Sequence, residues 1–135
     1  MRPIPLGTKG TSTLRVRPEH LASQFKDEIL PHVFSTPMMV LLMENAALAA
    51  VRPYLEAGES CVGTVVNIRH LAATPVGQQV RAEADVTHID GRRIEFNVTA
   101  YDEDQEIGRG VHERIVIDLR RFNERLARRV GDRRD

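Results

Sequence analysis

The segment from Phe34 to Tyr54 constrains the fold of this chain more than any other, because it is apolar around almost its whole circumference. Thr36 is a favourable N-cap, and Pro37 suits the first position of a helix, where its missing N–H costs nothing. Arg52-Pro53 closes the segment, since a proline disfavours helix in the residue before it. A helix that is hydrophobic on all sides is typically buried. The sequence therefore predicts one long helix inside the protein.

A single charged residue, Glu44, lies in the middle of this predicted helix. An unpaired buried charge is costly, so the carboxylate must be paired, protonated or functional. Two interpretations follow from the residues alone: a structural ion pair with an arginine such as Arg69 or Arg114, or a catalytic group. The apolar run of about 15 residues, interrupted by Glu44, is too short to span a membrane.

Beyond this helix the sequence changes from helical spacing to alternation, which is typical of strands. The clearest strand covers residues 76–89, and one of its faces carries only apolar side chains: Val76, Val80, Ala82, Ala84 and Val86. Asp90-Gly91 supplies a two-residue hairpin turn of the primed type. The partner strand is predicted at residues 92–101, with Ile94, Phe96, Val98 and Ala100 facing inward. Further strands are predicted at residues 11–17, 61–71 and 107–118.

One buried helix and five strands, joined largely by tight antiparallel turns, indicate an α+β domain. In the expected architecture an antiparallel sheet is wrapped around one long buried helix, with a polar outer face. A chain of 135 residues is long enough for one domain and too short for two. We expect residues 1–135 to form this single domain, with residues 1–10 and 124–135 loose or peripheral. Residues 119–135 are predicted to be a charged helix or a frayed tail.

Composition narrows the functional classes. Basic and acidic residues balance at 19 each, so net charge gives no reason to expect a nucleic-acid partner. One cysteine, Cys61, excludes an internal disulfide and suits a reducing compartment. The first residues lack a sustained apolar run before Lys9, so we expect no signal peptide. We expect a cytoplasmic protein with no membrane partner, and the absence of zinc-ligand spacing predicts no metal site.

Several short motifs occur in a characteristic order between Val33 and Asn123. They are Thr36, the helical run 39–44, Gly63-Thr64, His70-Leu-Ala-Ala-Thr-Pro75, Asp90-Gly-Arg-Arg93, Ile107-Gly108 and Gly110-Val-His-Glu-Arg114. In order and spacing they resemble the hotdog-fold acyl-CoA thioesterases, in particular the subgroup typified by fluoroacetyl-CoA thioesterase. The resemblance implies a hotdog fold, an acyl-CoA substrate, a homodimer or tetramer, and no cofactor apart from the coenzyme A of the substrate.

The resemblance also implies a catalytic set: a threonine at the helix start, a glutamate in the helix and a histidine on the following strand. The matching residues are Thr36, Glu44 and His70. It further implies that the Gly63 backbone N–H binds the thioester carbonyl and that Arg114 lies near the site. Thr36 and Glu44 are separated by roughly 12 Å of helix rise, so they cannot share a hydrogen bond within one chain. A long thioester spanning both residues, or a site completed by a second subunit, would bring them together, and this favours a dimer-interface site.

The chemistry fits these residue types, yet each has a simpler interpretation. Thioester hydrolysis needs a nucleophile or activated water, a proton donor for the thiolate and donors for the oxyanion. Thr36 is also adequately explained as an N-cap, His70 as a structural strand histidine and Cys61 as a small buried hydrophobe. In His112-Glu113-Arg114, alternation sends Glu113 to the opposite face, so a joint site of the three is not expected. The C-terminal arginines form either a solvated face or a contact with coenzyme A phosphates.

Two departures from the family bear on the substrate. In the fluoroacetyl enzyme, two phenylalanines before the helix form a hydrophobic lid, and the matching positions here are Asp27 and Leu30. We therefore do not expect selectivity for fluoroacetyl, whereas hydrolysis of a small or medium acyl-CoA remains expected. Pro37 follows Thr36 where a glycine is expected. Two other functional classes stay open: a hotdog enoyl-CoA hydratase or dehydratase, and a non-catalytic acyl-CoA binding domain.

Overall fold

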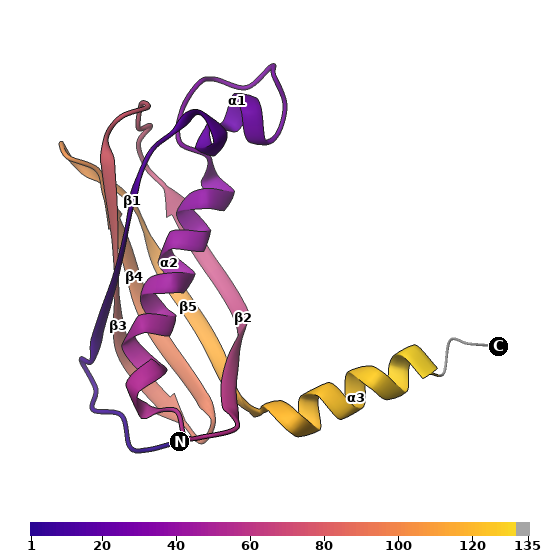
Figure 1. The fold of residues 1–135 in the computed structure, drawn as a ribbon. Helices are drawn as coiled ribbons and strands as arrows, with labels where there is room; N and C mark the ends of the chain where they lie inside the picture. Colours follow the sequence, from indigo (N-terminus) through magenta and orange to yellow (C-terminus); the bar gives the residue numbers. More distant parts are fainter. Residues whose placement is uncertain (132–135) are drawn as a thin grey trace.

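The structure, a computed structural model, describes residues 1–131 apart from the Phe25 side chain, and shows one curled antiparallel sheet against one long helix (Figure 1). Its elements are β1 (Lys9–Arg15), the 3₁₀ turn η1 (Pro18–His20), α1 (Ala22–Phe25), α2 (Thr36–Val51), the 3₁₀ turn η2 (Arg52–Tyr54), β2 (Glu59–His70), β3 (Gln79–Asp90), β4 (Arg93–Tyr101), β5 (Glu106–Asp118) and α3 (Leu119–Gly131). The sheet order is β1-β3-β4-β5-β2. The predicted α+β hotdog architecture is confirmed.

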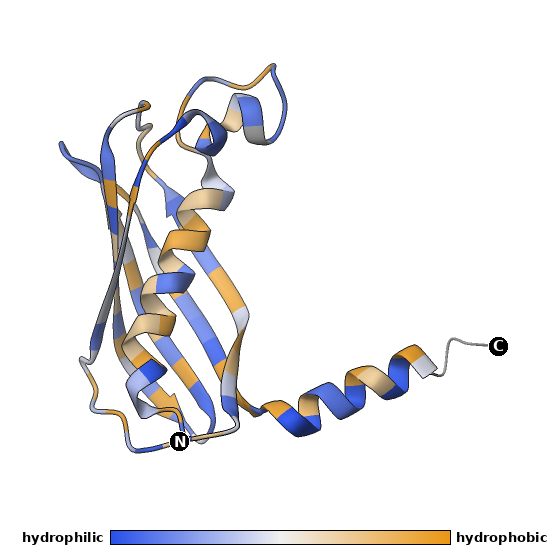
Figure 2. Ribbon diagram, viewed as in Figure 1, coloured by the Kyte–Doolittle hydropathy of each residue, from blue (hydrophilic) through white to orange (hydrophobic). Residues whose placement is uncertain are grey.

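The core lies between α2 and the inner face of the sheet. α2 packs mainly on β1 and β3, and it contributes seven buried residues, Met39, Leu42, Met43, Ala46, Ala47, Ala50 and Val51. Small residues allow this close approach: a Cβ on Gly10 of β1 would lie 2.1 Å from the Ala46 carbonyl oxygen. Polar and apolar bands alternate along β3 and β4 (Figure 2), and apolar side chains that alternate in this way all reach one face of the sheet.

The predicted alternation is confirmed for most positions. The inward residues of β3 and β4 are no more than 1% exposed: Val80, Ala82, Ala84, Val86, Ile94, Phe96, Val98 and Ala100. Val76 is the exception, because β3 begins only at Gln79 and leaves Val76 47% exposed in the preceding turn. The hairpin turn is shifted by one residue. Asp90 pairs with Arg93, so Gly91 and Arg92 form the loop, and Gly91 takes the positive φ of 61° that a primed turn requires.

The start of α2 differs from the prediction. Ser35, not Thr36, is the N-cap, and Thr36 is the first helical residue, with Pro37 after it. The Ser35 side chain makes no capping hydrogen bond. Because Thr36 lies inside the first turn, its hydroxyl is free of the capping role and points to another element of the fold.

One flank of α2 is not covered by the described residues of this chain. Leu41 is 47% exposed, and Asn45 and Ala49 are exposed one and two turns later. Across from this flank lies β2, the edge strand of the sheet, where Val66 on the helix-facing side is 48% exposed. The central strands of the sheet therefore bury one side of α2, whereas its other side, toward the edge strand β2, is open. The sequence predicted a helix that is covered on all sides.

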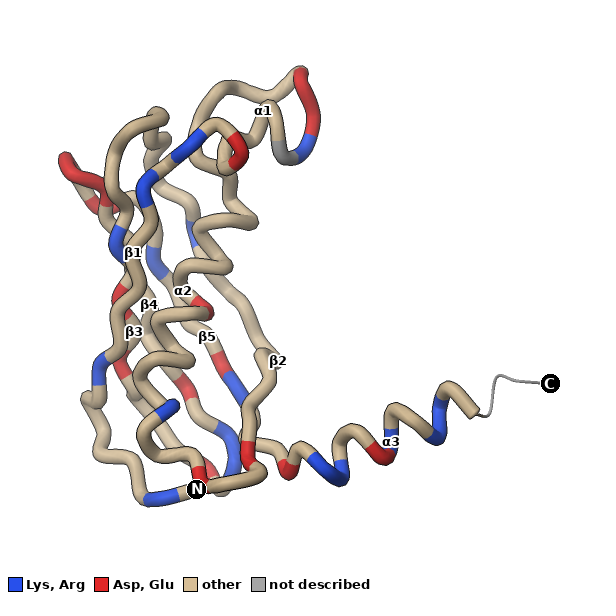
Figure 3. Tube along the Cα trace, viewed as in Figure 1, with Lys and Arg blue, Asp and Glu red and all other residues tan. Residues whose placement is uncertain are grey.

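The N-terminal segment packs against the domain, whereas the C-terminal helix does not. Near the N-terminus, Ile4 is only 7% exposed and the Arg2 N–H donates to the Tyr54 carbonyl oxygen at 2.8 Å, contacts that a loose segment would not make. The C-terminal helix α3 points away from the sheet, buries no residue and carries many charged side chains, most of them arginine (Figure 3). Residues 132–135 of the predicted tail lie outside the described part. No helix within residues 1–131 is both long and apolar enough to cross a bilayer.

Candidate active site

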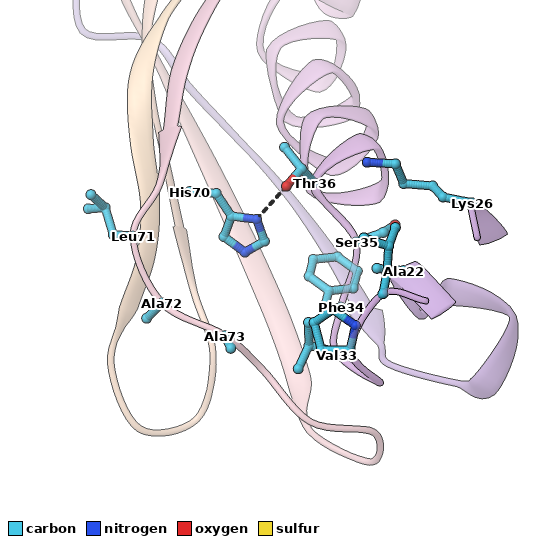
Figure 4. Close-up of a pocket in the computed structure, with 12 residues that line it drawn as sticks. Ala22, Lys26, Val33, Phe34, Ser35, Thr36, His70, Leu71, Ala72 and Ala73 are labelled. Carbon is cyan, nitrogen blue, oxygen red and sulfur yellow. Dashed lines mark hydrogen bonds between the residues drawn. The ribbon is translucent and has the colours of Figure 1, made fainter. Parts of the chain in front are cut away.

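Thr36 and His70 meet where α2 begins and β2 ends. The Thr36 hydroxyl oxygen lies 2.8 Å from Nδ1 of His70, which joins residues 34 positions apart in the chain (Figure 4). The pair lines a pocket of about 410 Å³. Its other walls come from the α1 region, which includes Lys26 and Leu30, and from the segments 33–35 and 71–73. Of the two predicted lid positions, Leu30 lines this pocket.

His70 is half-buried, and this burial favours its neutral form. Burial lowers the pKa of His70 from its ordinary value of 6.5, and the Ala72 backbone opposes the shift only partly. Its Nε2 atom is buried, and no described residue offers it a hydrogen bond of good geometry. A neutral ring carries hydrogen on one nitrogen only, so Nδ1 either accepts the proton of the Thr36 hydroxyl or donates to its oxygen, according to the tautomer.

Glu44 lies further along α2 and pairs with Arg114 of β5. The Arg114 Nη1 atom lies 3.3 Å from Glu44 Oε2. Arg114 is 9% exposed, and its guanidinium also donates to Cys61, from Nε to the sulfur at 3.2 Å and from Nη2 to the carbonyl oxygen at 3.3 Å. Of the two arginines considered for Glu44, Arg114 is the partner, whereas Arg69 is exposed. The ion pair does not exclude catalysis, because the Glu44 side chain remains 36% exposed.

Gly63 of β2 faces this ion pair. A Cβ at Gly63 would lie 2.8 Å from Glu44 Oε2 and 3.4 Å from Arg114 Nη1. The first distance is shorter than real Cβ contacts allow, so a side chain here would displace the carboxylate. The ladder between β2 and β5 is also irregular immediately after Gly63. Glycine therefore keeps open the space in front of Glu44 and leaves the Gly63 backbone accessible to a ligand.

His112 also belongs to this cluster, although sequence reasoning considered it only within His112-Glu113-Arg114 and gave it no role. Its Nε2 atom lies 3.2 Å from Arg114 Nη1, and its side chain is 2% exposed. Glu113 faces the opposite side, as alternation predicts, and lies 3.6 Å from Arg93. The signal was present in the sequence, because residues two apart on a strand share a face and His112 therefore accompanies Arg114.

The predicted site residues thus form two groups on one flank of the molecule. Thr36 and Glu44 lie on α2, two helical turns apart, and His70 and Gly63 come from β2. The first group offers a hydroxyl bonded to an imidazole; the second offers a carboxylate, a guanidinium and a glycine backbone. Among residues 1–131 no group of three or more His, Cys, Asp or Glu residues is arranged to hold a metal ion.

Comparison with known proteins shows the family to which the chain belongs. The family model of the fluoroacetyl-CoA-specific thioesterases matches residues 16–120. The chain is 46% identical over 100 residues to the fluoroacetyl-CoA thioesterase of Streptantibioticus cattleyicolor, an alignment that spans 74% of this chain and 72% of that protein.

Solved structures give the same result. A structure of fluoroacetyl-CoA thioesterase superposes with a TM-score of 0.88 at 37% identity, covering 93% of this chain and 97% of the other. A Thermus thermophilus hypothetical protein, described as a thioesterase superfamily member, superposes with a TM-score of 0.89 at 34% identity, covering 98% and 97%. Fold, sequence and family match therefore agree that this chain belongs to the fluoroacetyl-CoA-specific thioesterase family of thioester hydrolases.

Proposed function

We propose that this thioester hydrolase cleaves a small or medium acyl-CoA to the free acid and coenzyme A, along the open flank between α2 and β2. The observation that carries the proposal is the 2.8 Å contact between the Thr36 hydroxyl and His70 beside a pocket. A hydroxyl hydrogen-bonded to a neutral imidazole is a common arrangement for acyl transfer. The pocket is of a size to accept an acyl group, and the open flank leaves room for the pantetheine arm.

Each residue has a distinct role in this proposal. Glu44 is the base that activates water, or the nucleophile that attacks the thioester carbonyl. The Thr36 hydroxyl polarises or positions the thioester. His70 acts through that hydroxyl, because its Nδ1 is already hydrogen-bonded to it. With hydrogen on Nδ1, the Thr36 hydroxyl gives its own proton to the leaving thiolate and takes the Nδ1 proton in return, or the pair stabilises the oxyanion. The Gly63 N–H binds the carbonyl oxygen, and Arg114 holds the Glu44 carboxylate in place.

The separation of the two groups supports a homodimer with its sites at the interface. Thr36 and Glu44 are separated by roughly 12 Å along the same helix. Beside them lie an edge strand and two exposed apolar side chains, Val66 and Leu41. An edge strand is a ready template for pairing with a second chain. Two copies related by a twofold axis between Val66 and Asn67 would bring His70 of one protomer near the partner's Gly63, since that axis lies midway between the two residues along β2.

The first experiment is a measurement of thiol release from a panel of acyl-CoAs, from acetyl and fluoroacetyl to long and aromatic acyl groups. Wild type is compared with Glu44→Gln, and Glu95→Gln on the outer face of β4 is the control. We expect turnover of a small or medium member, a loss of about 100-fold or more in Glu44→Gln, and little change in Glu95→Gln. Wild-type turnover by Glu44→Gln would remove Glu44 from the mechanism. Binding of acyl-CoAs without any thiol release would contradict hydrolysis and favour a binding domain, and hydration of an enoyl-CoA would favour a hydratase.

Mixing two inactive variants tests whether the site spans two subunits. Thr36→Ala and Glu44→Gln are mixed under conditions in which subunits exchange. If one protomer supplies Thr36 and its partner supplies Glu44, each mixed dimer contains one intact site, and random exchange restores about a quarter of wild-type activity. If each chain supplies both residues to its own site, the mixture stays inactive, and the interface arrangement is wrong.

A further inference from the structure

His112 lies beside the Glu44–Arg114 ion pair, and its Nε2 atom is 3.2 Å from Arg114 Nη1. Its ring is buried on β5 and stacks against Phe96 of β4, with ring centroids 5.8 Å apart and planes inclined by 25°. The thioesterase roles proposed above leave this residue unused. A histidine of this kind is often only core filling, so its hydrogen bonds decide whether it does more.

The two ring nitrogens of His112 have partners that fix the tautomer. Nδ1 lies 2.7 Å from the Val65 carbonyl oxygen, which only accepts, so Nδ1 carries the hydrogen and donates it. Nε2 lies 3.2 Å from Arg114 Nη1, and a guanidinium only donates, so Nε2 presents its lone pair. Both contacts are satisfied together only when His112 is neutral and protonated on Nδ1.

The surrounding charges favour this neutral form. Burial lowers the pKa of His112 below its ordinary value of 6.5, and the neighbouring Arg114 lowers it further. The Val65 carbonyl and the carboxylates of Glu44 and Glu113 oppose the shift without reversing it. The other titratable group of the cluster is the Cys61 thiol on β2, which bonds to Arg114.

Arg114 is consequently held on three sides. Cys61 accepts from Nε and from Nη2, His112 accepts from Nη1, and the remaining contact of Nη1 is with Glu44. A planar guanidinium fixed at several positions has little rotational freedom left. The hydrogen bonds of Arg114 to His112 and Cys61 therefore set the direction in which its Nη1 atom points toward the Glu44 carboxylate.

We propose that His112 is a positioning residue for thioester hydrolysis: the neutral imidazole, protonated on Nδ1, accepts a hydrogen bond from Arg114 and so aims the guanidinium at the Glu44 carboxylate. This rests on the proposed role of Glu44. Protonation of His112 removes the acceptor and places a second cation beside Arg114. The arrangement is therefore lost as the pH falls through the pKa of His112.

Two substitutions separate the two hydrogen bonds. The amide of Asn overlays Nδ1 and keeps a donor for Val65, but it leaves Arg114 without an acceptor. The amide of Gln overlays Nε2 and keeps the acceptor for Arg114, but it gives up the bond to Val65. We expect His112→Asn to lower kcat by about 10- to 100-fold with little change in KM, and His112→Gln to keep most of the activity. In His112→Gln the fall in activity toward acid pH should also be shallower, because the amide does not titrate.

The exposed His88 on β3 supplies the matched control, since His88→Asn and His88→Gln should both behave as wild type. All variants are measured with the acyl-CoA that wild type hydrolyses fastest, alongside their thermal unfolding. Equal losses of kcat in His112→Asn and His112→Gln, or an unchanged kcat in His112→Asn, would overturn the positioning role while leaving the thioesterase proposal intact.

A measurement on the unmodified protein tests the same inference if the variants fold poorly. The ¹⁵N chemical shifts of the His112 ring distinguish the two neutral tautomers. We expect the Nδ1–H form with a pKa below 6.5. The Nε2–H form, or a ring that is cationic at neutral pH, would refute the proposal whether or not the protein hydrolyses acyl-CoA.

Discussion

The Thr36 hydroxyl oxygen and the Nδ1 atom of His70 are 2.8 Å apart, although one residue opens the long helix and the other ends the edge strand of the sheet. This contact exists because the helix begins one residue earlier than its sequence suggests, with Ser35 as N-cap. Thr36 is thereby released from capping and presents its hydroxyl to the pocket.

Two substitutions at Thr36 should separate the contribution of its hydroxyl to activity from that of its methyl group. Thr36→Ser keeps the oxygen that contacts His70 and should retain most of the activity. Thr36→Ala removes it and should lower kcat by about 100-fold, in the range typical for one catalytic hydrogen-bonding group. Steady-state kinetics of both variants checks this, and full activity in Thr36→Ala would show that the hydroxyl takes no part.

Ser35→Ala should leave stability almost unchanged. An N-cap serine ordinarily contributes about 1 kcal/mol through its capping hydrogen bond. Here the Ser35 side chain makes no such bond, and its buried oxygen has no partner among the described residues. We expect a change in the free energy of unfolding of less than about 0.5 kcal/mol by urea denaturation. A loss of the ordinary size would mean that the hydroxyl has a partner in solution.

Gly63→Ala should damage activity more than stability. Its methyl group would lie 2.8 Å from Glu44 Oε2 and would push the carboxylate away from Arg114. We expect kcat/KM to fall by at least about tenfold while the melting temperature changes little. Thr64→Ala, the exposed neighbouring position, is the control. Equal kinetics in the two variants would show that the space in front of Glu44 is not used by substrate.

Stability should decrease on the acid side of neutrality. The pKa values of His70 and His112 are both lowered by burial from 6.5, so the unfolded chain binds protons that the folded chain does not. Their contribution is complete above pH 6.5 and is lost as the pH falls toward the folded-state pKa values. Urea denaturation between pH 5 and pH 8 should show that the free energy of unfolding falls toward acid pH. His112→Gln checks the cause, because its free energy of unfolding should depend less steeply on pH. A free energy of unfolding that stays constant over the range would contradict the burial of both rings.

The proposed interface predicts different outcomes for two exposed valines. Val66 is 48% exposed on the helix-facing side of β2, whereas Val111 is 44% exposed on the outer face of β5. Val66→Glu should dissociate the dimer and abolish activity, because it buries a charge where two copies meet. Val111→Glu should leave the dimer intact. Light scattering after gel filtration distinguishes these outcomes, and a dimer that survives Val66→Glu would place the interface elsewhere.

The sequence by itself determined the fold and the candidate residues. The apolar segment between Ser35 and Arg52 leaves no stable state except a buried helix, because exposing it to water would be costly. Alternation along residues 79–101 then requires a sheet with one apolar face. The apolar helical segment and the alternating strands are local properties of the chain, so they can be predicted without knowing which segments contact each other.

Only the tertiary structure decided which of these residues meet. Thr36 with His70, and Glu44 with Arg114 and His112, come together through the packing of α2 beside β2 and β5. Such contacts depend on where separate elements are placed in space, and the periodicity of one element carries no information about its distance from another. The structure likewise showed that the flank of α2 toward β2 is left open, which no pattern within the helix itself predicts.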